Sequence, residues 1–262
     1  MTKRALTHAL VRQVGPSLSE CALTHLPRLP IDPTLATEQH QAYVNTLRNA
    51  GLDVTVLPPE PSLADSVFVE DMAVILDECI IAGRASSLGR REEHAHIAAA
   101  LNAIREVQSI EPPGTLEGGD VLVLGKTIFA GISSRTNDEG VRQLERLVSR
   151  HGYRVMRVGV HGCLHLKTAI TCVAPGVLVA NPQWIDLLPF APYEILTVPD
   201  QEPWGANTLL INAALMVAKS ASQTAELLRD RGFNVSVVDV SELQKAEAGL
   251  TCLSLVYRNA AT

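Results

Sequence analysis

Residues 116–160, LEGGDVLVLGKTIFAGISSRTNDEGVRQLERLVSRHGYRVMRVGV, decide the fold because they hold one complete copy of a repeating unit. The copy begins with a polar loop that ends in Glu-Gly-Gly-Asp at residues 117–120. Two apolar strands follow, at Val121–Leu124 and Thr127–Ile132, and the turn at Gly125-Lys126 between them predicts a β-hairpin. The unit therefore opens with a loop and a hairpin.

A helix and a third strand complete this unit. Thr136 and Glu139 form a capping-box pattern, which predicts that a helix begins there, and Gly152 follows its expected last residue, His151. A strand is then expected over Arg154–Val160. The order of elements in the unit is strand, strand, helix, strand.

The same order of elements recurs on both sides of this segment. The other hairpins are expected at Met72–Leu76 with Cys79–Gly83, at Thr168–Cys172 with Val177–Ala180, and around Leu209 and Met216. The other helices are expected near Ala36–Ala50, Arg91–Ile104, Gln183–Leu188 and Ser222–Arg231. The strands that follow them are expected at Asp53–Leu57, Glu106–Ile110, Glu194–Val198 and Asn234–Val238. The last strand, which carries Cys252, lacks a hairpin partner, and the N-terminal strand Ala5–Val11 can supply one.

One residue with reactive or polar chemistry occupies the equivalent loop in each unit. These residues follow one another at intervals of 42 to 48 positions, and they are Glu70, Glu117, His165, Asn207 and Cys252. Units that each bury one face against their neighbours form either a solenoid or a closed ring. Because the two ends of this chain can complete each other, we expect a ring of five α/β units whose equivalent loops meet at the centre.

The composition is typical of one globular domain. Of 262 residues, 47% are hydrophobic and 19% are charged, and no Pro-, Gly- or Ser-rich linker divides the chain. We therefore expect a single domain over residues 1–262. The formal net charge of −6 argues against nucleic acid or an anionic membrane as a partner. No apolar run approaches the roughly 18 residues that a transmembrane helix needs.

The cysteines indicate the compartment. Cys21, Cys79, Cys163, Cys172 and Cys252 are odd in number, widely scattered, and without a CxxC pair. This pattern is typical of reduced thiols and predicts a cytoplasmic protein. The expected partner is a small-molecule substrate, and the oligomeric state stays open, with a homodimer as one alternative.

Three of the loop residues have the chemistry of nucleophilic catalysis. Cys252 needs a base or a positive field to become a thiolate, His165 can supply either, and Glu117 can orient the imidazole. A cysteine in an apolar strand is more often a small buried hydrophobe. Their equivalent places in the repeat favour a catalytic group over that structural interpretation.

An acidic cluster in the first loop indicates a cationic ligand. Asp65, Glu70 and Asp71 flank the apolar Phe68, which is unusual in a solvated loop. A planar guanidinium has five N–H donors and suits paired carboxylates. Solvated turn residues are the alternative explanation.

Two arginines and an alternating His/Cys pattern complete the candidate residues. Arg90 and Arg135 follow the first two hairpins and could bind a ligand carboxylate, although each could also begin a solvated helix. His161, Cys163 and His165 would share one face of a strand and offer a zinc site, but no fourth ligand is close in sequence. No P-loop or dinucleotide fingerprint is present, and we expect neither a metal nor an organic cofactor.

Five ordered motifs resemble the dimethylarginine dimethylaminohydrolases, which belong to the guanidine-modifying, or amidinotransferase, superfamily. The motifs are Asp65-Ser-Val-Phe-Val-Glu-Asp71, Leu116-Glu-Gly-Gly-Asp120, Arg135-Thr-Asn137, Leu164-His-Leu-Lys167 and Leu250-Thr-Cys-Leu-Ser254. The similarity extends from about Thr7 to Tyr257. It implies a five-bladed α/β propeller of ββαβ units. It also implies a hydrolase acting on C–N bonds of linear amidines, which converts asymmetric dimethylarginine or monomethylarginine to L-citrulline through a covalent Cys thiouronium.

The resemblance also implies residue roles. Cys252 matches the nucleophile, His165 the acid/base and Glu117 its partner. The other matches are to substrate-binding groups: Glu70 and Asp71 to the guanidinium-binding carboxylates, Asp65 and Leu23 to groups near the α-amine and the lid, Phe68 to the pocket beside them, and Arg90 and Arg135 to carboxylate clamps.

One departure from the family pattern leaves the substrate open. Five residues before Cys252, where the family has Asp-Gly, this chain has Glu247-Ala248. Glu247 is thus expected beside the substrate with one extra methylene. A related guanidino or ureido amino acid, such as arginine or citrulline, is an alternative substrate. A noncatalytic propeller that acts as a binding module is the alternative from another class, and a zinc hydrolase is a third.

Overall fold

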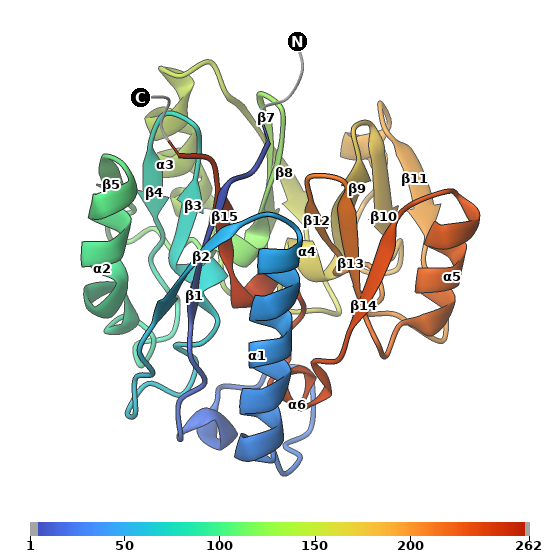
Figure 1. The fold of residues 1–262 in the computed structure, drawn as a ribbon. Helices are drawn as coiled ribbons and strands as arrows, with labels where there is room; N and C mark the ends of the chain where they lie inside the picture. The colour runs from blue at the N-terminus through green and yellow to red at the C-terminus, as the bar shows by residue number, and fades with distance from the viewer. Residues whose placement is uncertain (1–4, 260–262) are drawn as a thin grey trace.

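The computed structural model describes residues 5–259, and residues 1–4 and 260–262 lie outside the described residues. The single domain expected over residues 1–262 stays a prediction. Within the described range the strands form five three-stranded sheets arranged around a common centre (Figure 1). In each sheet the middle strand pairs antiparallel with one neighbour and parallel with the other. The predicted five-bladed α/β propeller is confirmed, and within residues 5–259 its third blade differs from the ββαβ order by lacking an α-helix between its second and third strands.

The first and second blades have the predicted order of elements. The first consists of β3 (Ala73–Ile75), β4 (Ile80–Ala82), α2 (Glu93–Ile104) and β5 (Val107–Ser109). The second consists of β6 (Val121–Leu124), β7 (Thr127–Ile132), α3 (Asp138–Ser149) and β8 (Arg154–Gly159). The capping prediction for α3 was wrong by one residue. Asn137 is the N-cap and its Oδ1 accepts from the Gly140 N–H at 2.8 Å, because the Thr136 hydroxyl is used elsewhere.

The third and fourth blades differ in their helices. The third has α4 (Leu166–Ala169), β9 (Ile170–Ala174), β10 (Val177–Ala180) and β11 (Glu194–Thr197). The fourth has β12 (Leu209–Ile211), β13 (Ala214–Ala218), α5 (Ser222–Asp230) and β14 (Val235–Val238). The helix expected at Gln183–Leu188 is wrong, because this stretch is turn and coil and only Leu188–Phe190 forms a 3₁₀ turn, η4. Ile185 instead forms an isolated bridge with Val160, which leaves no room for a helix there.

The two ends of the chain close the ring. β1 (His8–Arg12) lies between β15 (Leu255–Tyr257) and β2 (Asp53–Leu57), antiparallel to the former and parallel to the latter. The 17-residue helix α1 (Pro33–Asn49) completes this fifth blade. The predicted closure by the N-terminal strand is confirmed. Cys252 does not lie on the strand, however, but in the 3₁₀ turn η5 (Thr251–Leu253) that precedes it.

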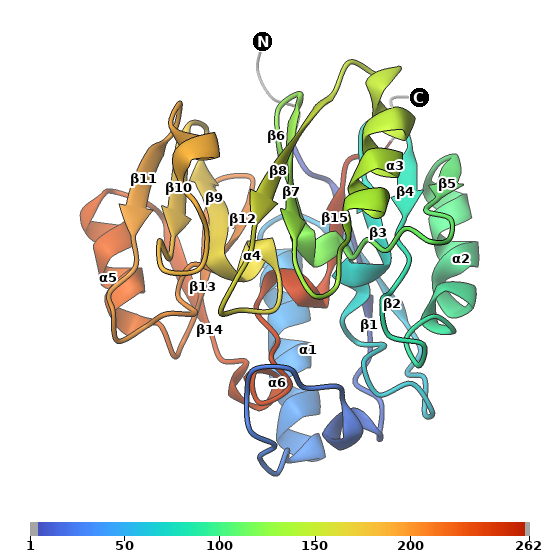
Figure 2. The same ribbon diagram turned by 180° about the vertical axis from the view of Figure 1, so that it is seen from behind.

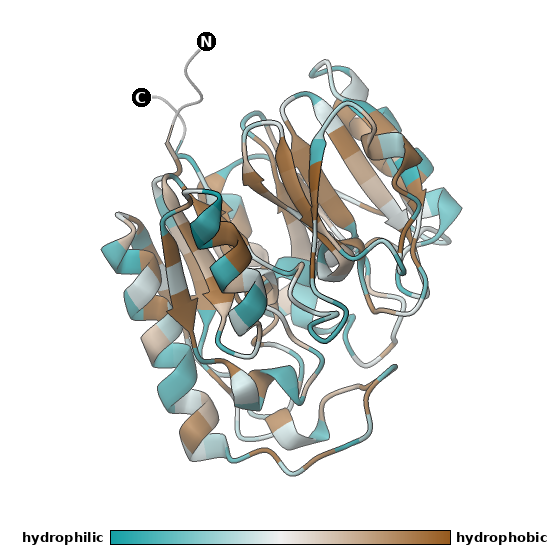
Figure 3. Cartoon of the chain, turned by 90° about the vertical axis from the view of Figure 1, so that its right-hand side faces the viewer, coloured by the Kyte–Doolittle hydropathy of each residue, from teal (hydrophilic) through white to brown (hydrophobic). Residues whose placement is uncertain are grey.

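Apolar side chains fill the space between sheets and helices. The strands are mostly brown, that is hydrophobic, in Figure 3, which agrees with the buried residues on both faces of the middle strands. On α1, Ala36, Tyr43 and Leu47 are fully buried at helical spacing. Among residues 5–259, no helix combines the length and apolarity needed to cross a membrane. Figure 2 shows the loop after β1, with η1 (Leu18–Glu20), beside α6 (Ser241–Gln244).

Candidate active site at the centre of the ring

Short turns at the inner ends of the hairpins bring the predicted loop residues together. Glu70 and Asp71 lie in the 3₁₀ turn η2 (Val69–Met72), and Glu117 directly precedes η3 (Gly118–Asp120). His165 is the N-cap residue of α4, and Cys252 lies in η5. Because each turn starts at the central end of a blade, residues separated by more than 40 positions in sequence become neighbours.

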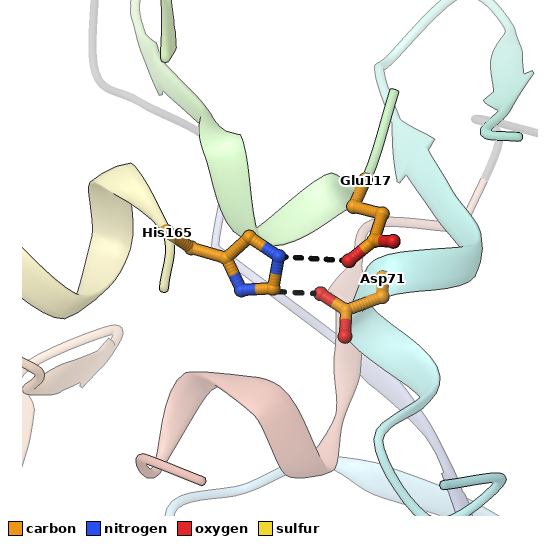
Figure 4. Close-up of side chains that lie close together, drawn as sticks. All are labelled: Asp71, Glu117 and His165. Atoms are coloured by element: carbon orange, nitrogen blue, oxygen red, sulfur yellow. Dashed lines mark hydrogen bonds and ion pairs between the residues drawn. The ribbon is translucent and has the colours of Figure 1, made fainter. Parts of the chain in front are cut away.

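The imidazole of His165 lies between two carboxylates from the first two blades (Figure 4). Its Nε2 is 2.8 Å from Glu117 Oε2, and its Nδ1 is 3.8 Å from Asp71 Oδ1. His165 is 2% exposed and Glu117 is not exposed at all. The predicted pairing of His165 with Glu117 is therefore present, and Asp71 is a second partner.

Two glycines allow this close approach. A Cβ on Gly119 would lie 2.6 Å from His165 Nδ1 and 2.9 Å from Asp71 Oδ1. A Cβ on Gly118 would lie 2.0 Å from the Glu70 carbonyl oxygen. The two glycines after Glu117 are therefore required by space, because any side chain would push the neighbouring turn and the imidazole away.

The surrounding charges hold a proton on His165. Burial alone would lower its pKa, but the charges of Asp71 and Asp120 and the hydrogen bond to Glu117 outweigh burial and raise the pKa to about 9. The pKa of Asp71 is lowered, because the charges of His165 and Arg90 outweigh the opposing effect of burial. The imidazolium is thus the stable form near neutral pH.

Hydrogen bonds with neighbouring residues fix Asp120 and Glu117. Asp120 is fully buried, and its carboxylate accepts from the Leu166 N–H at 2.9 Å and from the Ser133 hydroxyl at 2.6 Å. The Thr136 hydroxyl accepts from the Glu117 N–H at 3.1 Å. These contacts hold the segments on which His165 and Glu117 lie, so the imidazole has little freedom to reorient.

Two guanidinium groups compensate the carboxylates. Arg90 Nη1 donates to Asp71 Oδ2 at 2.8 Å, and its other nitrogens bond both oxygens of Glu93 at 3.0 Å. Arg135 Nη1 lies 3.7 Å from Glu117 Oε1. Both arginines are less than a tenth exposed, at 4% and 8%. Their assignment as clamps for a substrate carboxylate stays a prediction.

Glu70, the neighbour of Asp71 on η2, takes part in a second ion pair. Its Oε1 is 2.5 Å from Lys167 Nζ, and its Oε2 accepts from the Thr251 hydroxyl at 2.7 Å. Burial raises the pKa of Glu70 despite the charge of Lys167. Asn207 joins the same network, because its Nδ2 donates to the Lys167 carbonyl at 2.9 Å and its Oδ1 accepts from the Thr251 N–H at 3.1 Å.

A cavity of about 540 Å³ meets this network from the opposite end of the ring. Glu70, Lys167 and Thr251 line it, together with Lys126 and Arg258 from that end of the molecule. The ion pair between Glu70 and Lys167 therefore lies between the cavity and the residues around His165.

Cys252 is the fifth predicted loop residue and lies one residue from Thr251. Its side chain is buried, with 8% exposure, and its Sγ accepts from the Gly249 N–H at 3.3 Å. Burial raises the pKa of this thiol well above its ordinary value, and the nearby charges of Glu70 and Asp71 raise it further. In the unliganded protein the thiol is neutral and the imidazole is charged.

The remaining predicted residues lie on or around the loop at residues 22–26. Asp65 accepts from the Ala22 N–H at 3.2 Å, and burial raises its pKa. Leu23 is half-buried and packs against the apolar cluster that contains Phe68 and Cys252. Glu247 accepts from backbone N–H groups at residues 24–26 of the same loop. The structure places Leu23 and Phe68 in the apolar cluster of Cys252 and attaches Asp65 and Glu247 to the loop that carries Leu23. The contacts of these side chains with a substrate stay predictions.

The alternative zinc site is not formed. The segment 161–165 has bends and no strand, so His161, Cys163 and His165 do not share a face. The Cys163 thiol donates instead to the His165 carbonyl at 3.4 Å. Within residues 5–259, the donor atoms that come within 4.8 Å of one another belong to Asp71, Glu117 and His165, where Arg90 already compensates the two acids.

Sequence reasoning missed four residues of the site. Lys167, Thr251 and Glu93 bond predicted residues, and Asp120 accepts from the N–H of Leu166, next to His165, but none of the four was assigned a role. Three of them lie in or beside the quoted motifs, within three positions of an assigned residue. Glu93 lies three positions after Arg90, the spacing at which ion pairs form on a helix.

A five-bladed ring that gathers a cysteine, a histidine and several carboxylates at its centre defines the class of this protein as the amidinotransferase superfamily. The family model described as "N,N dimethylarginine dimethylhydrolase, eukaryotic" matches residues 31–188. The Streptomyces coelicolor N(G),N(G)-dimethylarginine dimethylaminohydrolase is 38% identical over 252 residues, which cover 95% of this chain and 96% of that protein. The chain belongs to the dimethylarginine dimethylaminohydrolase family.

Solved structures agree with this membership. A Pseudomonas aeruginosa dimethylarginine dimethylaminohydrolase variant complexed with citrulline has a TM-score of 0.91 and 31% identity, covering 97% of this chain and 100% of that one. A dimethylarginine dimethylaminohydrolase adduct with S-methyl-L-thiocitrulline also has a TM-score of 0.91, with 32% identity over 96% of this chain and 100% of that one.

Proposed function

We propose that the protein hydrolyses Nω-methylated arginine, either asymmetric dimethylarginine or monomethylarginine, to L-citrulline and dimethylamine or methylamine. The observation that carries this proposal is the buried imidazolium of His165, held by Glu117 and Asp71 at the same centre as the Cys252 thiol. The names of the relatives and the citrulline complex support the same substrate class.

The acidic centre is suited to a guanidinium. Glu70 and Asp71 lie on one turn and are almost fully buried, so a bound cation would meet carboxylates in a site of low dielectric. We propose that they bind the guanidinium beside Cys252. Asp65 then takes the α-amine and Arg135 the α-carboxylate. Arg90 assists Arg135 but has fewer free N–H groups, because Asp71 and Glu93 already occupy most of them.

The first half of the proposed reaction transfers the amidine carbon to sulfur. A substrate cation beside Cys252 favours the thiolate, and the thiol proton leaves to solvent. The thiolate adds to the guanidinium carbon and forms the C–S bond. His165, already protonated, donates its proton to the methylated nitrogen, the C–N bond breaks, and neutral methylamine or dimethylamine departs. A cationic thiouronium on Cys252 remains.

The second half releases the product. Neutral His165 removes a proton from water, and the resulting hydroxide adds to the thiouronium carbon. The C–S bond breaks, the electron pair returns to Cys252 as thiolate, and loss of one proton gives neutral citrulline. The covalent route divides a difficult hydrolysis into two steps, and positioned acid–base catalysis contributes about 10²–10⁴-fold.

The test measures citrulline and dimethylamine released from asymmetric dimethylarginine by the wild-type protein and by Cys252→Ser. Cys172→Ser is the matched control, because Cys172 is a half-buried thiol on β9, outside the predicted site residues. We expect turnover by the wild type and the control, and none by Cys252→Ser. Turnover by Cys252→Ser would overturn the nucleophile, and no turnover by a folded wild type would overturn the substrate.

A second candidate is the hydrolysis of unmethylated arginine at the same site. This alternative rests on the sequence, in which Glu247 stands where the family pattern has Asp, five residues before Cys252. The same assay with arginine decides between the two, because the mechanism is shared and only the departing amine differs. A noncatalytic binding module would turn over neither substrate, yet would still bind them.

We also propose that the protein is cytoplasmic and that it forms a homodimer. Among the described residues the five cysteines are not joined in disulfides, which fits a reducing compartment. Cell fractionation tests the location, and sedimentation of the purified protein tests the assembly. Recovery in a secreted or membrane fraction, or a monomeric mass, would contradict the respective proposal.

A further inference from the structure

One buried carboxylate, that of Glu247, holds the loop that lies over the site. Its two oxygens accept from the Thr24 N–H at 3.0 and 2.9 Å. One of these oxygens, Oε1, also accepts from the His25 N–H and, at 2.5 Å, from the Leu26 N–H. Three consecutive N–H groups therefore converge on one anion, a cradle of the kind that backbone makes for phosphates and carboxylates.

These bonds are the main attachment of the middle of the loop. Thr24 and His25 are exposed and have no apolar anchor, whereas Leu23 packs against the core. The other polar attachments come from Asp65, which accepts from the Ala22 N–H, and from Arg135, whose Nη2 donates to the Thr24 hydroxyl at 3.1 Å. The loop is thus attached to residues that are also candidates for binding substrate.

Glu247, whose carboxylate holds the loop, and Cys252 lie on one short segment of the chain. Glu247 has a φ of 60°, a conformation that residues other than glycine rarely adopt. Two residues later the Gly249 N–H donates to Cys252 Sγ. A strained residue at this point indicates that the surrounding structure holds Glu247 in place, so the loop position and the thiol position depend on the same backbone.

We propose that Glu247 is a positioning residue that latches the loop at residues 22–26 over the site, and that it does not bind the guanidinium directly. Its Oε1 already accepts three N–H groups and its Oε2 accepts one, so the acceptor capacity of this carboxylate is used mainly by the loop. This inference rests on the proposed function only for its kinetic consequence. The latch itself exists without substrate and can be measured without it.

The proposal predicts how Glu247 affects the reaction. A latched loop orders Leu23, Asp65 and Arg135 around the amino-acid end of the substrate before it binds. Without the latch, part of the binding energy must order the loop, so KM rises while kcat stays the same. A carboxylate that contacted the guanidinium would instead change kcat and the preference among methylated and unmethylated guanidines.

The experiment compares hydrogen exchange of the amides at residues 24–26 in the free protein with steady-state kinetics. The variants are Glu247→Gln, which keeps the shape but loses the charge, and Glu247→Ala, which removes every acceptor. Glu242→Gln is the matched control. Glu242 is also a buried carboxylate of this region, and it accepts a backbone N–H from Asp32, which lies outside the loop.

We expect about tenfold or faster exchange at residues 24–26 in Glu247→Gln and more in Glu247→Ala, with a raised KM, unchanged kcat and no such change in the control. Circular dichroism and the melting temperature establish that the variants fold. Unchanged exchange in both variants would overturn the latch even if the protein has no activity. Faster exchange with an altered kcat ratio for dimethylarginine and arginine would overturn the exclusion of a direct contact.

Discussion

The two walls of the central site are built differently. On the wall formed by the first three blades, His165, Glu117 and Asp71 are almost completely buried, and each is fixed by hydrogen bonds from neighbouring turns. On the second wall, which carries Cys252, one N–H group among residues 5–259 donates to Sγ, and the loop at residues 22–26 is largely exposed. The difference indicates that the residues for proton transfer are in place before substrate binds. Cys252 and the loop at residues 22–26 instead adjust to the substrate.

The largest expected effect comes from a substitution on the wall that carries His165. Glu117→Gln removes the charge that faces His165 Nε2, so the pKa of His165 falls below about 9 and less imidazolium is available to protonate the departing amine. We expect kcat to fall by roughly 10²–10⁴-fold. Steady-state kinetics and an NMR titration of His165 measure both changes.

An acid on the outer helix α3 provides the control for this variant. Glu139→Gln, on the outer helix α3, should leave kcat and the His165 titration unchanged. If Glu117→Gln kept full activity, the two walls would not differ in the way described.

The second effect tests the buried ion pair between Glu70 and Lys167. Lys167→Met leaves the Glu70 carboxylate buried with only the Thr251 hydroxyl as a partner. Breaking a buried pair from one side costs about 3 kcal/mol, so the free energy of unfolding should fall by that amount in urea titrations. The double variant Lys167→Met/Glu70→Gln should recover most of the loss. Equal losses in the single and double variants would show that this ion pair is not energetically coupled.

The third effect is a dependence of stability on pH. His165 has a pKa of about 9 in the folded protein, above the value near 6.5 that it has when unfolded, so the folded state holds its proton more tightly. The resulting stabilisation, up to about 3 kcal/mol, is complete below about pH 6.5 and is lost as the pH rises through about 9. Urea unfolding between these pH values should show the decline, and His165→Asn should flatten it. A stability that rises over this range would contradict the charged imidazole.

The sequence predicts the wall that carries His165 better than the wall formed by the loop at residues 22–26. The hairpin-helix-strand order is encoded locally, so Val121–Leu124 and its counterparts could be recognised, and equal spacing then placed Glu117, His165 and Cys252 at one centre. The chemistry of Glu70 and Asp71 was visible because acids beside an apolar run are unusual.

Other features depend on contacts between distant segments. The capping of α3 by Asn137 in place of Thr136 follows from the Thr136 hydroxyl bonding the Glu117 N–H, which no local pattern shows. Likewise, the contact of Glu247 with residues 24–26 joins positions more than 200 apart. Lys167 was visible in a motif, but its partner Glu70 becomes evident only once the blades are placed around the ring.

The most direct measurement of the contrast between the walls is the pH dependence of Cys252 alkylation by iodoacetamide in the free protein, with the labelled residue identified by mass spectrometry. Because burial, Glu70 and Asp71 raise the pKa of this thiol, we predict that the rate at Cys252 keeps rising beyond pH 9, above the ordinary thiol pKa of about 8.5. A rate that reaches its plateau near pH 7 would show a thiolate already paired with the imidazolium, and would contradict the account.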